Sequence, residues 1–422
     1  MIRRRMLAAV GLAMATMLPL AACGGGEDEA EGGPVELTVA VWSLASTPEF
    51  QTLFDAFHKA NPDITIKPVD ILAADYPTKV TTMLAGGDST DVITMKTLAD
   101  YVRFAGRGQL ADVTDLATKP ESAKLAGLDQ YKQDGDKYYA LPYRQDHWVL
   151  YYNKKMFDTA KLPYPENLTW DQYVEAAKKL TTGTGDKKVY GAYQHTWRSV
   201  VQAISAAQNG GDQLGGDYKF FAEQYRTALA LQEAGATQDF GTAVTQKTGY
   251  ASMFESQKTA MLPMGTWFIA KLLSEKKKGT TDVDWGIAPM PQRTGASGVT
   301  TFGAPTAFAV NKKAKHAAAA KKFVEFAASI EGAKAIAGIG VVPALKTDEV
   351  LQQYFALQGM PTDELSKKAF TPDKINPEMP VSDKTAKVDT VLNEEHQLIM
   401  TKQKSIDDAI KEMETRVKNE IG

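Results

Sequence analysis

The sequence is poor in the residues that carry covalent and metal chemistry. Its 422 residues include one cysteine and five histidines. A single cysteine cannot form a disulfide within its own chain, and no two histidines have the spacing of a metal site. The sequence also lacks the Gly-x-Ser-x-Gly elbow, the phosphate loop that ends in Gly-Lys-Ser/Thr, and a Gly-x-Gly-x-x-Gly run after a strand. These absences argue against metal enzymes, nucleotide-binding enzymes and serine hydrolases, and no metal or cofactor is expected.

An excess of positive charge is also absent. The chain has 48 Lys and Arg against 51 Asp and Glu, which gives a formal net charge of −3 at pH 7. Nucleic-acid-binding domains carry a basic surface, so this balance gives no indication of a nucleic-acid partner. A secreted glycosidase stays open as an alternative, because its two catalytic carboxylates come from distant segments and leave no spacing motif.

The one cysteine, Cys23, stands at the end of an N-terminal pattern. Three arginines in residues 1–5 precede an uncharged run over residues 6–22, and the tract GGGEDEAEGG follows the cysteine. A short cationic region, a short apolar region and small residues at its end are typical of a secretory signal. The tract holds no residue that could join a core, so we expect a flexible tether over residues 23–34. Removal of residues 1–22 would remove three arginines and no acid, which takes the net charge from −3 to −6.

From Pro34 onward, strand-like and helix-like segments alternate. The β-branched run VELTVAVWS predicts a strand, and a helix follows it with Thr47 as N-cap and Pro48 in the first turn. ITIKPVD, YPTKVTTMLAGG and DVITM then predict a strand, a helix and a strand. This alternation is typical of an α/β protein with parallel strands covered by helices.

The later segments predict three further features. Thr169 and Gln172 form a capping-box pair that predicts the start of a helix, which a glycine would end. Residues 314–338 predict one long alanine-rich helix. Residues 359–383 hold four prolines and predict an irregular surface connection.

Seven stretches, in order along the chain, resemble one protein family. They are LTVAVWS, TTMLAGGDSTDVITM, ALPYRQDHWVLYYNKKMFD, LTWDQYVEAAKKLT, FESQKTAMLPMGTWFIAKL, VDWGIAPMPQRTG and FVEFAASIEGAKAIAGIGVVPALK. Together they resemble the extracellular solute-binding proteins of ABC importers, sugar-binding type, the group that includes maltose-binding protein. The tetrapeptide LAAC (20–23) also resembles the lipobox of bacterial lipoproteins. That second resemblance implies cleavage before Cys23 and attachment of a diacylglyceryl group to its sulfur.

The family resemblance implies a fold and a function. The fold is α/β, two-lobed and periplasmic-binding-protein-like, with a ligand cleft between lobes that crossover strands join. Residues 35–145 and 303–345 would form one lobe, and residues 146–302 and 346–422 the other. The function is that of a monomeric binding protein, with no enzymatic activity, that captures a di- or oligosaccharide outside the cell. It would deliver this ligand to an ABC permease while the lipid at Cys23 holds it on the extracellular face of the membrane, as in Gram-positive bacteria.

A sugar presents hydroxyls and apolar C–H faces, so its site needs aromatic platforms and directional polar groups. Trp42 ends the first predicted strand, where ligands lie in open α/β sheets, and Ser43 and Ser46 follow it. Trp197 follows another predicted strand, and the nearby Gln194 could bind a hydroxyl. We therefore expect these five residues to contact the ligand.

The resemblance adds further contacts. It places Trp267 at the family's stacking position, Lys96 in a contact loop, and Asp146 where maltose-binding relatives use a carboxylate on sugar hydroxyls. The alternative for Asp146 is an ion pair with Arg144. Weaker candidates, from strand ends and nearby loops, are Asp70, Met95, Thr97, Trp148, Asn209 and Phe302.

The class of ligand stays open at this point. Arg144 and Arg198 lie near predicted contacts and would also suit an acidic or phosphorylated sugar. A polyamine would need several convergent carboxylates, and a glycerophosphate would need the two arginines to converge. These small polar solutes are the alternatives to a neutral carbohydrate.

Overall fold

The structure is a computed structural model that describes residues 33–421. The predicted secretory signal, most of the predicted tether and the predicted lipidation site Cys23 lie outside the described residues. The chain from Pro34 onward forms one compact unit. Within residues 33–421, no helix is long and apolar enough to cross a membrane.

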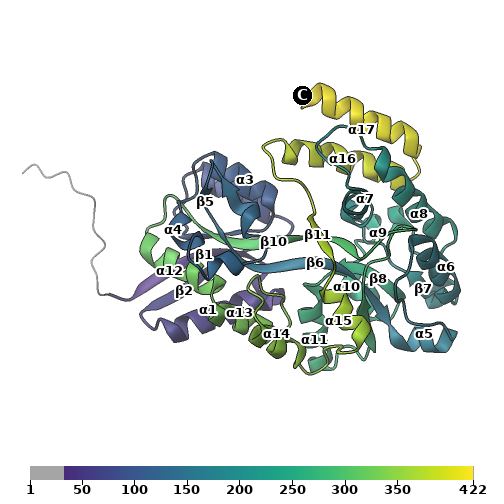
Figure 1. Ribbon diagram of the computed structural model, residues 1–422, viewed down its shortest axis with the longest axis horizontal. Helices are drawn as coiled ribbons and strands as arrows, with labels where there is room; N and C mark the ends of the chain where they lie inside the picture. Colours follow the sequence, from purple (N-terminus) through teal and green to yellow (C-terminus); the bar gives the residue numbers. More distant parts are fainter. Residues whose placement is uncertain (1–32, 422) are drawn as a thin grey trace, which may run out of the picture. The chain divides into compact units, whose positions relative to one another are not determined.

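Nine strands of the described chain join one sheet in the order β2-β1-β3-β10-β6-β8-β7, with β11 beside β10 and β9 beside β6. Figure 1 shows the long strands β6 and β10 side by side. A separate two-stranded sheet pairs β4 with β5. The strands are β1 Val35–Trp42, β2 Ile64–Ile71, β3 Val92–Met95, β4 Lys132–Gln133, β5 Lys137–Tyr138, β6 Leu141–Asn153, β7 Tyr190–Ala192, β8 Thr259–Gly265, β9 Trp285–Ala288, β10 Thr300–Val310 and β11 Lys374–Pro377.

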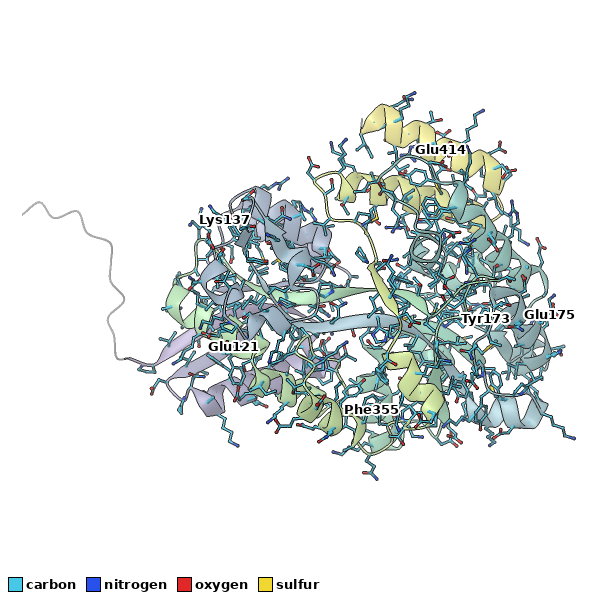
Figure 2. The ribbon with its side chains drawn as sticks, in the orientation of Figure 1. Glu121, Lys137, Tyr173, Glu175, Phe355 and Glu414 are labelled. Atoms are coloured by element: carbon cyan, nitrogen blue, oxygen red, sulfur yellow. The ribbon has the colours of Figure 1, made fainter. Side chains whose placement is uncertain are left out.

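Helices cover both halves of this sheet. They are α1 Pro48–Ala60, α2 Tyr76–Ala85, α3 Leu98–Gly106, α4 Thr114–Ala117, α5 Lys154–Ala160, α6 Trp170–Leu180, α7 Gln202–Asn209, α8 Ala222–Glu233, α9 Phe240–Thr245, α10 Tyr250–Glu255, α11 Phe268–Lys278, α12 Ala317–Ala328, α13 Ile330–Ala337, α14 Asp348–Phe355, α15 Glu364–Phe370, α16 Thr385–Met400 and α17 Ile406–Glu420. Their amphipathic pattern sets which face is buried. In α6, for example, Tyr173 is buried and Glu175 is exposed (Figure 2).

The predicted α/β class is confirmed, and the early elements form where the sequence predicts them. Strand β1 pairs parallel with both β2 and β3, so the carboxyl ends of these three strands lie at one edge. Helix α1 buries the phenylalanine- and leucine-rich face that its spacing predicts. The capping box of Thr169 and Gln172 is present at the start of α6.

Strands β6 and β10 link the two groups of strands. The first half of β6 pairs antiparallel with β10, and its second half pairs antiparallel with β8 and β9. Strand β10 in turn pairs with β3. The short strand β7 runs parallel to β8. Side chains from the middle of β6 therefore lie between the ends of two sets of parallel strands.

Three predictions about later elements are wrong. Helix α6 ends at Leu180 with an extended Thr181, not with a glycine, because the next residue, Thr182, pairs with Val189. The alanine-rich run 314–338 forms two helices, α12 and α13. Ser329 separates them, because it is extended and its hydroxyl accepts the N–H of Gly332 as an N-cap.

The proline-rich segment 359–383 is not irregular throughout. Asp363 caps helix α15 by accepting the N–H of Ser366. Strand β11 follows and pairs parallel with β10, with Asn376 opposite Phe302. The prolines at 372 and 377 stand just before β11 and at its end, so they limit the strand without preventing it.

Candidate ligand-binding site

One face of β6 carries three of the residues that the sequence singles out. Successive strand residues point to opposite faces, so Arg144, Asp146 and Trp148 share a face. Strand β8 pairs with β6 so that Gly265 lies opposite Trp148. This register brings Trp267, two residues beyond Gly265, close to Trp148.

Trp267 reaches this position because residue 265 has no side chain. A Cβ atom built on Gly265 would lie 1.9 Å from the Trp267 ring, well inside the limit of any real contact. Glycine therefore lets the indole fold back over the end of β8. The segment after β7 lies beside Trp267, because β7 runs parallel to β8 and Ala192 lies opposite Met261. That segment carries Gln194, His195 and Trp197.

These segments build a group of rings that we call the aromatic wall: Trp148, His195, Trp197, Tyr250 and Trp267. The ring centroids of Trp148 and Trp267 lie 5.7 Å apart, those of Trp197 and Trp267 6.3 Å, and those of His195 and Trp197 4.5 Å. The ring centroids of Tyr250 and Trp197 lie 5.9 Å apart, and the Tyr250 hydroxyl accepts the indole N–H of Trp267 at 3.3 Å. Trp197 is 43% exposed, so the wall presents an open aromatic surface.

Buried polar atoms without partners lie beside this surface. Within the described chain, Oε1 of Gln194, Nδ1 of His195 and Nε1 of Trp148 have no hydrogen-bond partner. Other buried side-chain atoms of residues 33–421 also lack partners; these three differ because their residues belong to the aromatic wall or directly precede it in the chain, so a ligand on the wall could bond to them. Burial lowers the pKa of His195 to about 4, which keeps its ring neutral at physiological pH. A neutral imidazole offers one donor and one acceptor, so it can either donate to a hydroxyl oxygen or accept a hydroxyl hydrogen.

Charged groups line the same face of β6 but pair with one another. Arg144 forms ion pairs with Glu49 of α1 and, at 3.1 Å, with Asp146. Asp146 is 3% exposed and also accepts the Thr266 hydroxyl at 2.9 Å. Burial raises the pKa of Asp146, and Arg144 and Thr266 oppose that rise. The ion pair stated as the alternative for Asp146 is therefore present, and both carboxylate oxygens are engaged.

On the other side of Arg144, Trp42 lies at the end of β1. It is 7% exposed and packs edge-on against Phe50 and Tyr76. Nζ of Lys96 lies 5.3 Å from the Trp42 ring and donates to the carbonyl of Ala73 at 2.6 Å. The Arg144 guanidinium lies 5.9 Å from the same ring. Little of the Trp42 surface is free in this structure.

The remaining predicted residues fall into two groups. Ser43, Ser46 and Asp70 hold the loop after β1, since Ser43 accepts the N–H of Ala73, Ser46 donates to the Ser43 carbonyl, and Asp70 accepts the N–H of Leu44. The others are structural in this geometry: Met95 is buried, Thr97 caps α3, Asn209 donates to the Ser205 carbonyl, and Phe302 stacks on Trp148 with ring centroids 4.9 Å apart.

Comparison with known proteins identifies the family. The sequence model of the bacterial extracellular solute-binding proteins matches residues 42–334. The chain belongs to this family. As a solute-binding protein it is not an enzyme, which removes the glycosidase alternative, and the family resemblance stated from the sequence is confirmed.

Relatives of this solute-binding protein include structures and characterised chains. A sugar transporter of Rhizobium etli, solved in an open conformation, is 38% identical, with 91% of this chain and 99% of that chain covered and a TM-score of 0.78. The diacetylchitobiose-binding protein of Streptomyces coelicolor is 27% identical, with 81% of this chain and 82% of the relative covered. The maltodextrin-binding protein of Bacillus subtilis is 26% identical, with 74% and 73% covered. The fold predicted for the solute-binding protein, two-lobed and periplasmic-binding-protein-like, is confirmed by the structural likeness.

Two residues of the candidate site were not predicted from the sequence. Tyr250 lies four residues before the family stretch that begins at Phe254 and outside it, and the packing of α10 against β8 brings it to Trp267. His195 stands between Gln194 and Trp197, so its place in the chain was a usable signal. A histidine a few residues beyond the carboxyl end of a parallel strand lies where α/β proteins of this kind hold their ligands.

Proposed function

We propose that this solute-binding protein captures a neutral di- or oligosaccharide on the aromatic wall. The observation that carries the proposal is the exposed Trp197 ring beside three unpartnered buried polar atoms. Sugars have apolar C–H faces that cover aromatic rings and hydroxyls that both donate and accept. Trp197 and Trp267 would stack on sugar rings, while Gln194 and His195 would bind hydroxyls.

The charges near the wall support a neutral ligand. Arg144, the cation on this face of β6, is paired with Glu49 and Asp146 and so is not free for a phosphorylated or acidic ligand. A polyamine would need free carboxylates, and those same two acids are already paired. The names of the relatives point the same way, since the two curated chains are described as binding diacetylchitobiose and maltodextrin.

The predicted contacts at the ends of β1 and β3 would reach the ligand when the two lobes close around it. We propose that residues 35–145 and 303–345 form one lobe, that residues 146–302 and 346–422 form the other, and that they close around the ligand. Trp42, Ser43, Ser46 and Lys96 would then approach it from the end of β1 and β3. Asp146 would act by holding Arg144 and Thr266 in place. This division assigns stacking to one lobe and mostly polar contacts to the other.

We also propose that the chain works as a monomer on the outer face of the membrane. The lipobox at residues 20–23 supports cleavage before Cys23 and a lipid on its sulfur. The bound saccharide would pass to the permease of an ABC importer. Labelling of cells with a fatty-acid analogue should mark the wild-type chain and leave Cys23→Ser unmarked; equal labelling would contradict the anchor.

The ligand class can be tested by thermal unfolding of residues 34–422, which form one compact unit. The panel contains maltotriose, diacetylchitobiose and other di- and oligosaccharides, with spermidine and glycerol 3-phosphate as charged alternatives. A ligand that binds only the folded state adds about 2.7 kcal/mol of stability at a hundredfold excess over its Kd. Stabilisation by one group of neutral saccharides is expected. A response to spermidine or glycerol 3-phosphate alone would contradict the proposal.

A further inference from the structure

The segment that carries Trp197 is bonded to the C-terminal part of the chain. Arg198, the next residue, is buried although its side chain is charged. Its Nε donates to Oδ1 of Asp389 at 2.7 Å, and one terminal nitrogen lies 2.5 Å from the same oxygen. Asp389 belongs to α16, almost two hundred residues further along the chain.

Every nitrogen of this guanidinium is engaged. One terminal nitrogen donates to Oε1 of Gln202 at 3.0 Å and to Oε1 of Gln213 at 2.9 Å. The other contacts Asp389 and the sulfur of Met379 at 3.3 Å. Arg198 therefore has no donor left for a ligand, although its position in the sequence allowed an acidic one. Its planar guanidinium group, bonded to these partners, instead holds the backbone next to Trp197 in one orientation.

Further bonds hold the same C-terminal segment against this region. Glu378 accepts the hydroxyl of Ser199 with its carboxylate and the side-chain N–H of Gln213 with its backbone carbonyl. Gln202 donates to the backbone carbonyl of Leu392 in α16. Just before this segment, β11 pairs with β10 beside Phe302, which stacks on Trp148. The part of the chain from β11 to α16 is thus linked to the aromatic wall at two places, through Arg198 next to Trp197 and through Phe302, which stacks on Trp148.

We infer that Asp389 is a positioning residue for the binding site: through Arg198 it sets the orientation of Trp197 without touching the ligand. The inference rests on the proposed stacking role of Trp197. Removal of the Asp389 charge would leave Arg198 buried without its ion-pair partner and held only by Gln202, Gln213 and Met379, so the chain around Trp197 would be held less firmly. Affinity should then fall although no contact with the ligand is removed.

The test compares Asp389→Asn with Glu394→Gln in residues 34–422. Glu394 is a matched control because it lies on the same helix, pairs with Arg416 at 2.7 Å, and has a side chain 53% exposed against 52% for Asp389. The affinity is measured by titration calorimetry with the saccharide that stabilises the wild type most in the panel above. Substitutions that act through neighbouring groups typically change affinity by about twofold to thirtyfold, so a loss of at least about twofold is expected for Asp389→Asn. Glu394→Gln should keep the wild-type Kd.

Two further readouts separate positioning from general stability. In a Trp197→Ala background, Asp389→Asn should cause no additional loss of affinity, because the ring that it positions is gone. In the ligand-free protein, acrylamide quenching reports mostly on Trp197, the tryptophan that is most exposed. Asp389→Asn should change this quenching, and Glu394→Gln should leave it unchanged. Arg198→Lys, which keeps the charge but loses the fork, should act in the same direction as Asp389→Asn.

Several results would overturn the inference. They are an unchanged Kd in Asp389→Asn, an equal loss with and without Trp197, and quenching equal to that of wild type. If no saccharide binds the wild-type protein, the proposed function fails, and the quenching measurement alone decides whether Asp389 positions Trp197.

Discussion

Trp197→Ala removes the most exposed ring of the aromatic wall. A tryptophan side chain can bury up to about 250 Å². Trp197 is 43% exposed, which leaves roughly 110 Å² open to a ligand on that scale. If a sugar covers half of that area, about 25 cal/mol per Å² gives about 1.4 kcal/mol. A loss of binding free energy of this size raises the Kd about tenfold.

The assay for Trp197→Ala is titration calorimetry with the best saccharide of the panel. Tyr164→Ala serves as the control, because Tyr164 is 38% exposed but lines a separate hollow with Lys154 and Asp363. It should keep the wild-type Kd. The reasoning is refuted if Trp197→Ala binds as tightly as wild type, or if both variants lose the same affinity, since the effect would then not depend on the aromatic wall.

Two further predictions concern the aromatic wall, and a third concerns His396, a buried histidine of α16. Trp267→Ala should weaken binding by at least about 1 kcal/mol while circular dichroism shows an intact fold, because a stacking ring is removed; unchanged calorimetric binding would take Trp267 out of the site. Gly265→Ala should weaken binding to a similar degree, because the new Cβ would lie 1.9 Å from the present Trp267 ring and displace it; wild-type affinity in this variant would contradict that displacement. Burial lowers the pKa of His396 to about 3, whereas the pKa of a histidine in the unfolded chain is about 6.5. Between these two pH values the imidazole is protonated in the unfolded chain and neutral in the folded protein. The free energy of unfolding therefore falls as the pH falls through this range. Urea titrations at several pH values measure how steeply the free energy of unfolding changes with pH. In His396→Gln this slope should be smaller by up to about 1.4 kcal/mol per pH unit, and an unchanged slope would show that His396 is not the group responsible.

The sequence could predict the elements whose signals are local. The β-branched run before Trp42, the spacing of apolar residues in α1 and the capping box at Thr169 each depend on neighbours a few positions away. The prediction of one long helix over residues 314–338 was wrong because the alanine-rich helical spacing continues across Ser329. Only the extended backbone at that residue, with its hydroxyl on the N–H of Gly332, shows that a second helix begins there.

The candidate site was predicted in part for the same reason. Trp197 and Trp267 each follow a strand, and the parallel pairing of β7 and β8 brings the two strand ends together. The partners of the charged groups could not be read from the sequence, because Glu49 lies 95 residues from Arg144 and Thr266 lies 120 residues from Asp146. Those long-range pairs decide which charges are free, and so they decide which ligand classes fit.

The most direct test of the central claim is a crystal structure of residues 34–422 with the saccharide that stabilises them most. The account predicts sugar rings against Trp197 and Trp267, with hydroxyls bonded to Oε1 of Gln194 and Nδ1 of His195. It also predicts that Arg198 keeps its bonds to Asp389. A saccharide seated away from the aromatic wall, or a site that leaves Gln194 and His195 without partners, would contradict it.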